Sequence, residues 1–327
     1  MHSTYRPFRS IAALAGVLSC LTLAVDRPSI RAQQPVKSRA MALTFDDLPF
    51  VAAGEAYFPA ATRTTSELLR VLRRHRAPAI GFVNEGQLDA GGERRSAREA
   101  LLKEWIDAGM TLGNHTYAHR DFNTQTIAAF QDDIVKGEPV VKRMMAARGS
   151  PPLFFRHPMT HTGDTKEKKD AIDAFLSARG YRLAPHTIEN SDFIFNVVYV
   201  RALAAGDRAL AGRVRDAYVD LTMAATAFAE GASPAIFKRD IPQTLLLHAN
   251  VLTAESLETL LARFEARGYR FIALEEAMAD PAYTTPDTMV SASGPTWLWR
   301  WARTLGVRVS AEGDPEVPAW VLEAYRR

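Results

Sequence analysis

The chain has 327 residues, of which 47% are hydrophobic and 24% are charged. This length suits one large α/β domain or two small ones, and the composition excludes a disordered or fibrous protein over most of the chain. The formal net charge is +3, and residues 1–32 account for all of it, because they hold four arginines and one aspartate. The remainder is therefore close to neutral, which argues against a nucleic-acid-binding protein.

The N-terminal segment has the pattern of a secretory signal. Arg6 and Arg9 precede an apolar stretch over residues 11–25, and a small residue follows at a plausible cleavage site. We expect residues 1–32 to be a signal peptide and residues 33–39 a short leader. The mature protein would then be exported to the periplasm or the extracellular space, without a stable membrane span. An uncleaved membrane anchor is the second interpretation, although the apolar stretch is short for a transmembrane helix.

The chain has one cysteine, Cys20, and it lies inside the expected signal peptide. Its surroundings vaguely resemble a lipoprotein site, but the apolar run continues past it to Val25, which argues against lipidation. The mature protein would therefore have neither a disulfide nor a thiolate ligand. Any metal ion must then be held by histidines and carboxylates.

From residue 40 onward, short apolar runs alternate with longer amphipathic ones. The pattern predicts strands over residues 41–45, 79–83, 111–113, 153–155, 181–184, 193–195, 244–247 and 269–273. It predicts helices over residues 63–76, 96–108, 124–148 with a break near Gly137 and Pro139, 166–179, 198–231 and 255–267. Such alternation indicates a parallel sheet covered by helices. About seven repeats favour a closed or nearly closed barrel over an open sheet.

The repeating pattern occupies residues 40–280, which we expect to form a single catalytic domain. Residues 281–327 are expected to be a tail that packs on the barrel. Trp297 and Trp301 lie one helical turn apart in this tail and would share a helix face. They could stack on sugar rings, but we expect them to attach the tail to the barrel.

Polar residues follow several of the predicted strands. They are Asp46-Asp47, Asn114-His115 with His119 four residues later, Arg156-His157-Pro158-Met159, and His248-Ala249-Asn250. Each group alone has an ordinary explanation as a turn, a helix surface or a structural histidine. The carboxyl ends of strands in a parallel barrel meet at one mouth, however, so we expect these groups to converge there.

The chemistry of this set suits hydrolysis. Two imidazoles and one carboxylate make a good site for a divalent ion such as zinc, with positions left open for water and substrate. A second carboxylate can accept the proton of the attacking water, and a histidine can protonate the leaving group. The set therefore predicts hydrolysis of an amide or an ester. No H-E-x-x-H motif occurs in the sequence, so it is not a metalloprotease site of that type.

Five short motifs resemble those of the polysaccharide deacetylases, the NodB-homology family. They are Ala42-Leu43-Thr44-Phe45-Asp46-Asp47, Gly113-Asn114-His115-Thr116-Tyr117-Ala118-His119, Phe155-Arg156-His157-Pro158, Ser191-Asp192-Phe193 and Leu245-Leu246-Leu247-His248. The resemblance covers residues 40–280. It implies a distorted (β/α) barrel of about seven parallel strands and an enzyme that removes acetyl groups from a polysaccharide or oligosaccharide.

The resemblance also implies a role for each residue of the site. The metal ligands would be Asp47, His115 and His119, and the ion would be zinc, with cobalt or manganese as alternatives. The catalytic groups would be Asp46 as general base, Arg156 holding Asp46 ionised and oriented, His248 as general acid, and Asp192 tuning His248. The backbone N–H of Met159 would stabilise the oxyanion, and Leu246 would wall the acetyl pocket.

The sequence departs from the family pattern at three positions. His157 and Met159 stand where the family often has proline and tyrosine, and Phe193 follows Asp192 where the family has tryptophan. We expect His157 to be an exposed loop residue, with contact to the substrate as the alternative, and Glu85 could line the cleft.

The function expected is removal of acetyl groups from N-acetylated sugars. An O-acetyl esterase on acetylated glycans and a non-catalytic carbohydrate-binding barrel are the two alternatives. The base and the acid argue against a purely binding protein, which would need neither.

Overall fold

The computed structural model describes residues 39–51, 57–89, 93–149 and 153–327. The expected signal peptide, Cys20 and most of the leader lie outside these residues. No helix in the described ranges is both long enough and apolar enough to cross a membrane.

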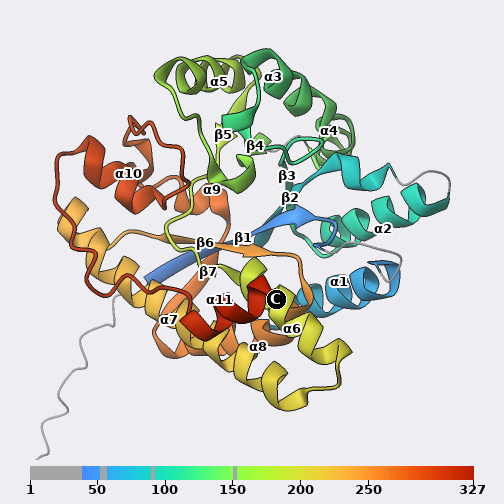
Figure 1. Cartoon of the computed structure of the whole chain (residues 1–327). Coiled ribbons are helices and arrows are strands. Elements are labelled where there is room, and N and C mark those ends of the chain that lie inside the picture. The colour runs from blue at the N-terminus through green and yellow to red at the C-terminus, as the bar shows by residue number, and fades with distance from the viewer. Residues whose placement is uncertain (1–38, 52–56, 90–92, 150–152) are drawn as a thin grey trace, which may run out of the picture. The chain divides into compact units, whose positions relative to one another are not determined.

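Within the described residues, seven strands form one sheet, and every pair of neighbours is parallel. The strands are β1 (Arg39–Leu48), β2 (Ala79–Val83), β3 (Thr111–Asn114), β4 (Leu153–Phe155), β5 (Tyr181–Leu183), β6 (Gln243–His248) and β7 (Tyr269–Ile272). Their order is β5-β4-β3-β2-β1-β6, and β7 pairs with the first residues of β1. The long β1 therefore contacts three strands and lies at the centre of the sheet (Figure 1).

The two ends of this strand order are joined by the chain that follows β5. Ile188 forms an isolated parallel bridge with Leu245 of β6. The N–H of Leu246 donates to the Ile188 carbonyl at 3.0 Å, and the N–H of Ile188 donates to the Thr244 carbonyl at 3.0 Å. The connection closes the sheet into a distorted barrel, as expected, with a single bridge where a regular barrel would have a full strand pair.

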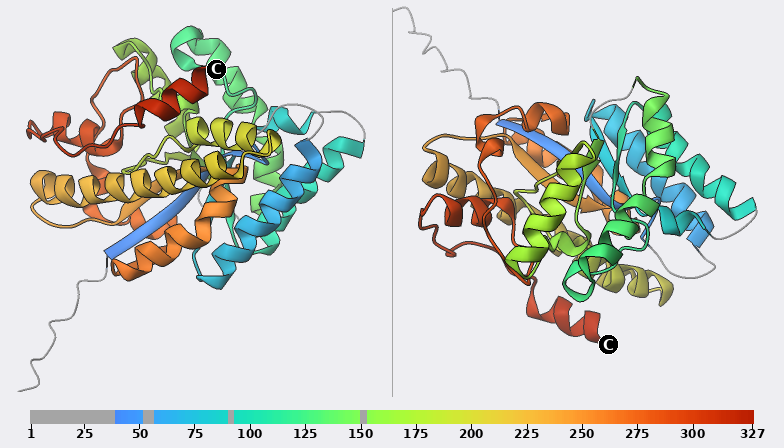
Figure 2. Two further views of the ribbon diagram at one scale, coloured as in Figure 1. Left: turned by 60° about the horizontal axis from the view of Figure 1, so that its bottom comes forward. Right: turned by 90° about the horizontal axis from the view of Figure 1, so that it is seen from above.

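Helices cover the strands on the outside. They are α1 (Tyr57–Arg74), α2 (Glu93–Asp107), α3 (Ile127–Lys136), α4 (Pro139–Ala146), α5 (Lys166–Ala178), α6 (Asp192–Ala204), α7 (Arg208–Phe237), α8 (Val251–Ala266), α9 (Leu274–Ala277), α10 (Trp297–Thr304) and α11 (Ala319–Arg326). Figure 2 shows β1 passing through the middle of the described part of the chain, with α1 and α8 side by side beneath it. The break predicted near Gly137 and Pro139 is confirmed as the boundary between α3 and α4.

The core lies between the strands and this helical layer. Phe45 of β1 is fully buried, and its ring packs edge-on against Trp105 of α2 with the ring centroids 5.2 Å apart. Val83 of β2 and Leu68 and Leu72 of α1 belong to the same buried cluster. This packing fixes the position of β1 and, with it, the backbone positions of the residues at its carboxyl end.

Two predictions about the chain after β5 are wrong. Residues 193–195 form the first turn of α6, although their large apolar side chains favour a strand. The predicted long helix over residues 198–231 is two helices, α6 and α7. Gly206 lies between them with φ of 73°, a conformation that ends a helix. For residues 193–195, tertiary contacts of the α6 N-terminus, described below, favour a helix over a strand.

The C-terminal segment packs on the rest of the described chain. Trp297 and Trp301 are only 3% and 1% exposed, so neither presents a ring face for stacking on a sugar. The Trp301 ring contacts Phe237 of α7 and Tyr283, with centroids 5.6 and 5.1 Å away. The helix α10 contacts α7, and α11 contacts α6.

Candidate active site

Two adjacent carboxylates stand at the carboxyl end of β1. Consecutive side chains of a strand point to opposite faces, so Asp46 and Asp47 would ordinarily diverge. Here the pairing with β2 is irregular between Phe45 and Leu48, and Asp47 has φ of 63°. This local distortion brings both carboxylates to the same place. His115 Nε2 lies 3.9 Å from Asp46 Oδ2 and 3.5 Å from Asp47 Oδ1.

The two histidines of the H-x-x-x-H motif come from the loop after β3, not from one face of a helix. His115 is buried, and its Nδ1 lies 2.8 Å from the backbone carbonyl of Arg156. Only a protonated Nδ1 can donate to a carbonyl, so the neutral ring presents the lone pair of Nε2. His119 Nε2 lies 3.3 Å from Asp47 Oδ1, and the two imidazole centroids are 5.0 Å apart.

The residues Asp47, His115 and His119 fit a divalent metal ion. One ligand atom from each lies within 4.8 Å of the other two. Burial moves the pKa of His115 well below 6.5, which keeps the ring neutral. Asp47 Oδ1 is buried and accepts no hydrogen bond from the described part of the chain. Lone pairs that converge without a proton between them repel one another, and a cation removes that repulsion.

Asp46 lies beside Arg156, and both side chains are buried. Arg156 donates from Nη1 to Asp46 Oδ2 at 3.4 Å and from Nη2 to Thr44 Oγ1 at 3.1 Å. Its guanidinium also lies 4.9 Å from the Phe82 ring centroid. Burial raises the pKa of Asp46 above its usual range, and the charge of Arg156 offsets this only in part. Arg156 therefore orients Asp46 and favours its ionised form, while burial acts in the opposite direction.

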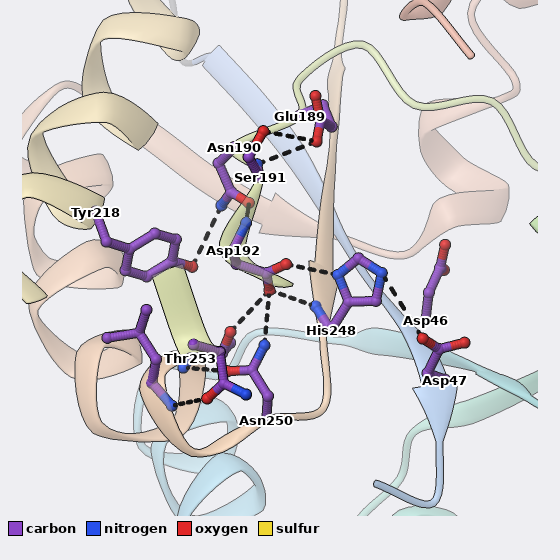
Figure 3. Close-up of polar contacts among 12 residues, drawn as sticks. Asp46, Asp47, Glu189, Asn190, Ser191, Asp192, Tyr218, His248, Asn250 and Thr253 are labelled. Carbon is purple, nitrogen blue, oxygen red and sulfur yellow. Dashed lines mark hydrogen bonds and ion pairs between the residues drawn. The ribbon is translucent and has the colours of Figure 1, made fainter. Parts of the chain in front are cut away.

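His248 ends β6 and is held by a buried carboxylate (Figure 3). Its Nδ1 lies 2.6 Å from Asp192 Oδ1, and its backbone N–H donates to Asp192 Oδ2 at 2.7 Å. The Oδ2 atom also accepts from Asn250 Nδ2 at 3.3 Å and Thr253 Oγ1 at 2.9 Å. The other ring nitrogen, Nε2, lies 4.0 Å from Asp47 Oδ2.

This environment favours the protonated form of His248. Burial alone would lower the pKa of the imidazole, but the charge and hydrogen bond of Asp192, with smaller contributions from Asp47 and Asp46, raise it to about 10. The paired imidazolium in turn lowers the pKa of Asp192, although burial acts to raise it. The site thus places two further titratable groups beside the three convergent side chains: Asp46 Oδ2 lies 3.9 Å from His115 Nε2, and His248 Nε2 lies 4.0 Å from Asp47 Oδ2.

The remaining predicted residues surround this centre. Met159 is 49% exposed, and Leu246 is buried opposite Thr44 in the pairing of β1 with β6. Phe193 is 42% exposed, and its ring is 5.9 Å from that of His248. Eight non-glycine residues of the described chain have positive φ, and most belong to the loops of this site: Asp47, Thr116, His119, Met159, Thr160 and Ser191. Such strain concentrates where a fold fixes side chains for a function.

Two expectations about neighbouring residues are wrong. His157 is fully buried, not exposed, and stacks on Phe130 with ring centroids 5.9 Å apart. Glu85 does not line the cleft, because its Oε1 accepts the backbone N–H groups of Val140 and Val141 at 2.7 and 2.9 Å. It therefore caps the N-terminus of α4 from another part of the chain.

Two asparagines of the predicted strand-end groups have supporting roles that were not predicted from the sequence. Asn114 accepts the N–H of Thr116 at 2.7 Å and donates to Tyr181 Oη at 2.9 Å, which fixes the start of the histidine loop. Asn250 caps α8 by accepting the N–H of Thr253 while it donates to Asp192. An asparagine directly before an amphipathic helix is a recognisable capping signal, but its second contact with Asp192 is not readable from the sequence.

Parts of this chain are similar to known proteins. The sequence model of the family "Polysaccharide deacetylase" matches residues 33–174. A chitin deacetylase from Colletotrichum lindemuthianum is 32% identical over 164 residues, which are 48% of this chain and 58% of that protein. A peptidoglycan-N-acetylglucosamine deacetylase from Bacillus cereus is 27% identical over 124 residues, which are 38% of each chain. This chain thus spans 58% of the first relative and 38% of the second.

One solved structure with a similar fold is a CE4 family pseudoenzyme from Bacillus anthracis. It has a TM-score of 0.48 and 17% identity, and the match covers 74% of this chain and 66% of that one. Residues 33–174 of this chain are thus similar to the polysaccharide deacetylase family, and both curated relatives are named as deacetylases.

Proposed function

We propose that the protein is a metal-dependent deacetylase that hydrolyses the N-acetyl group of an amino sugar in a polysaccharide. The observation that carries the proposal is the convergence of Asp47, His115 and His119 beside two other groups. These are Asp46, which pairs with Arg156, and His248, which pairs with Asp192. A binding protein has no need of a base and an acid placed around a metal site.

Asp47, His115 and His119 would hold the ion, which we propose to be zinc, with cobalt or manganese as substitutes. When bound, such an ion polarises an acyl carbonyl and makes water a better nucleophile. Asp46 would accept the proton of the attacking water. Its raised pKa makes it a stronger base than a free aspartate, and Arg156 fixes its orientation.

The leaving amine requires a proton, and His248 would supply it from Nε2. Asp192 holds the opposite side of the ring, so the imidazolium is both oriented and stabilised before the reaction. The backbone N–H of Met159 would donate to the developing oxyanion. Leu246 would form one wall of the pocket for the acetyl methyl group.

The substrate proposed is an N-acetylated glycan. Two relatives are named as deacetylases of chitin and of peptidoglycan N-acetylglucosamine, and both names support an N-acetyl amino sugar. The O-acetyl esterase alternative uses the same groups, but an alkoxide leaves more readily than the amide anion of an unprotonated amine, so ester hydrolysis depends less on an acid such as His248. The placement of Asp192 around that histidine favours the amide substrate.

We further propose that residues 1–32 direct export and are removed, so that the enzyme acts in the periplasm or outside the cell. Residues 40–280 would be the catalytic domain and residues 281–327 its C-terminal tail. A cell-envelope or extracellular glycan would be within reach of an exported enzyme.

Acetate release by the purified protein tests the function. The substrates are oligomers of N-acetylglucosamine, peptidoglycan and O-acetylated xylan, each with zinc and with a chelator. We expect zinc-dependent release from an N-acetylated substrate. Release from acetylated xylan alone would assign an O-acetyl esterase. Tight glycan binding with zinc bound but without acetate release would assign a non-catalytic barrel.

A further inference from the structure

The turn that carries Met159 is held by a distant part of the chain. It follows β4 and spans Pro158–Thr160. Thr160 Oγ1 donates to the carbonyl of Gly294 at 2.9 Å, and Arg300 Nη2 donates to the carbonyl of Thr160 at 3.2 Å. Both partners belong to residues 287–300, which we call the C-terminal clamp. The clamp lies outside residues 33–174, the stretch that matches the family.

The turn needs external support because its backbone is strained. Met159 and Thr160 have φ of 53° and 54°, two consecutive non-glycine residues in the left-handed region. Such conformations persist only where the surrounding structure fixes them. Within the turn, Thr160 and His161 donate their N–H groups to the carbonyls of His157 and Pro158 at 3.0 and 3.1 Å. Those two bonds close the turn, and the clamp holds it against the barrel.

Arg300 is the anchor of the clamp. Its side chain is fully buried, and its guanidinium lies 4.8 Å from the Trp297 ring centroid. Nη1 donates at 2.9 Å both to Thr162 Oγ1 and to Asp287 Oδ2, and Nε donates to the Pro295 carbonyl at 3.1 Å. A planar guanidinium engaged in several directions is rigid, and its charge is balanced by Asp287. Arg300 therefore ties the turn and the clamp into one unit.

Gly294 leaves no free space between the clamp and the turn. A methyl group added to its α-carbon would overlap Thr160 Oγ1 and the backbone carbonyl oxygen of Met159. The carbonyl belongs to the main chain, so the overlap can be relieved only by moving the turn or the clamp. Glycine at this position is thus a requirement of close backbone approach.

From these contacts we infer that the C-terminal clamp positions the backbone of Met159 and Thr160 for catalysis, with Arg300 as a positioning residue. This rests on the proposed function, in which the Met159 N–H donates to the oxyanion. A donor of this kind works only at the right distance from the oxygen, and a displacement of about 1 Å can cost about 10²-fold in rate.

Two variants test the inference by kinetics on the full chain with zinc. Gly294→Ala should lower kcat by about 10²-fold with KM within about twofold, because the turn is displaced while the rest of the substrate site is intact. Arg300→Lys keeps the charge but loses the planar fork, so we expect a loss in kcat of about tenfold. The matched controls are Gly231→Ala, in an open position on α7, and Arg263→Lys, an exposed ion pair. Both should keep wild-type kinetics.

Hydrogen exchange of the Thr160 and His161 amides gives a readout that does not depend on activity. Both clamp variants should exchange these amides about tenfold faster than wild type, while the controls do not. Unchanged kcat and exchange in Gly294→Ala would overturn the inference, even if Arg300→Lys does not fold. Loss of zinc or of cooperative folding along with kcat would also overturn it, because the clamp would then be general support. If the wild-type protein releases no acetate, the proposed function fails, and exchange alone decides whether the clamp holds the turn.

Discussion

Replacing Asp192 by asparagine removes one buried negative charge beside His248 and preserves the size of the side chain. The oxygen Oδ2 accepts three donors, from the His248 backbone, Asn250 and Thr253, so the amide NH₂ of the variant must take the other position. It then faces His248 Nδ1, which lies 2.6 Å from Oδ1 in the wild type. The N–H of His248 Nδ1 would then meet an N–H of the asparagine amide, so the imidazole can no longer donate there. The protonated imidazole also loses the carboxylate that balances its charge.

The size of the change in the His248 pKa follows from the surroundings of the imidazole with and without the Asp192 charge. In the wild type, burial lowers the pKa of His248 and Asp192 raises it, with about 10 as the result. Without the charge of Asp192 we expect the pKa to fall toward the 6.5 of an ordinary histidine, because burial still lowers it and only Asp47 and Asp46 still raise it. A general acid must be protonated, so activity falls as the pH rises through its pKa. At pH 8 a histidine with a pKa near 6.5 is only about 3% protonated. The complete loss of a general acid costs about 10²–10⁴-fold.

The assay compares pH profiles of kcat/KM for Asp192→Asn and wild type on two substrates. The alkaline limb should move to lower pH in the variant. An acetamide substrate should lose far more activity than an activated acetate ester, whose leaving group needs no proton. The control is Asp216→Asn, which removes an exposed carboxylate on α7. Equal losses on both substrates, or an unmoved alkaline limb, would refute the role given to Asp192 and His248.

Three further predictions concern the metal, the base and the N-terminus. Chelation should abolish activity, and added zinc should restore it. The variants Asp47→Ala and His119→Ala should lose the ion. Full metal content in both variants would contradict the ligand assignment. Asp46→Asn should retain the metal and lose about 10²–10⁴-fold in turnover, with near-normal turnover as the contrary result. In the wild type, activity should fall as the pH drops through the raised pKa of Asp46. Sequencing of the exported protein should find an N-terminus near Gln33, whereas an intact Met1 would indicate an anchor.

The alternation of apolar runs was sufficient to predict most of the fold. The limits of β2 are those predicted from the sequence, and the break at Gly137 was recognised because glycine and proline mark helix ends. Residues 193–195 were not predicted correctly, because local propensity favours a strand there. The contacts of Asp192 with β6 and α8 fix this segment as a helix, and they connect residues more than fifty positions apart.

The candidate site was predictable as a set of residues, but not as a geometry. Polar residues after apolar strands indicated Asp46, His115 and His248, since strand ends of a parallel barrel converge. The bulge that turns Asp47 toward the same mouth has no sequence signal. Arg300 was also missed, because an arginine in an amphipathic helix normally faces solvent, and its burial depends on Asp287 and Thr162.

The central position of β1 has a consequence for how the chain acquires its structure. β1 is complete at residue 48, yet two of its three partners, β6 and β7, begin at residues 243 and 269. During synthesis the strand that carries both aspartates therefore has an unpaired edge until nearly the whole barrel sequence exists. Pairing over such separations is slow, and an exposed apolar strand edge favours aggregation in the meantime. Asp46 can pair with His248 only after residues 243–248 have been synthesised, so the active site cannot be complete before that point.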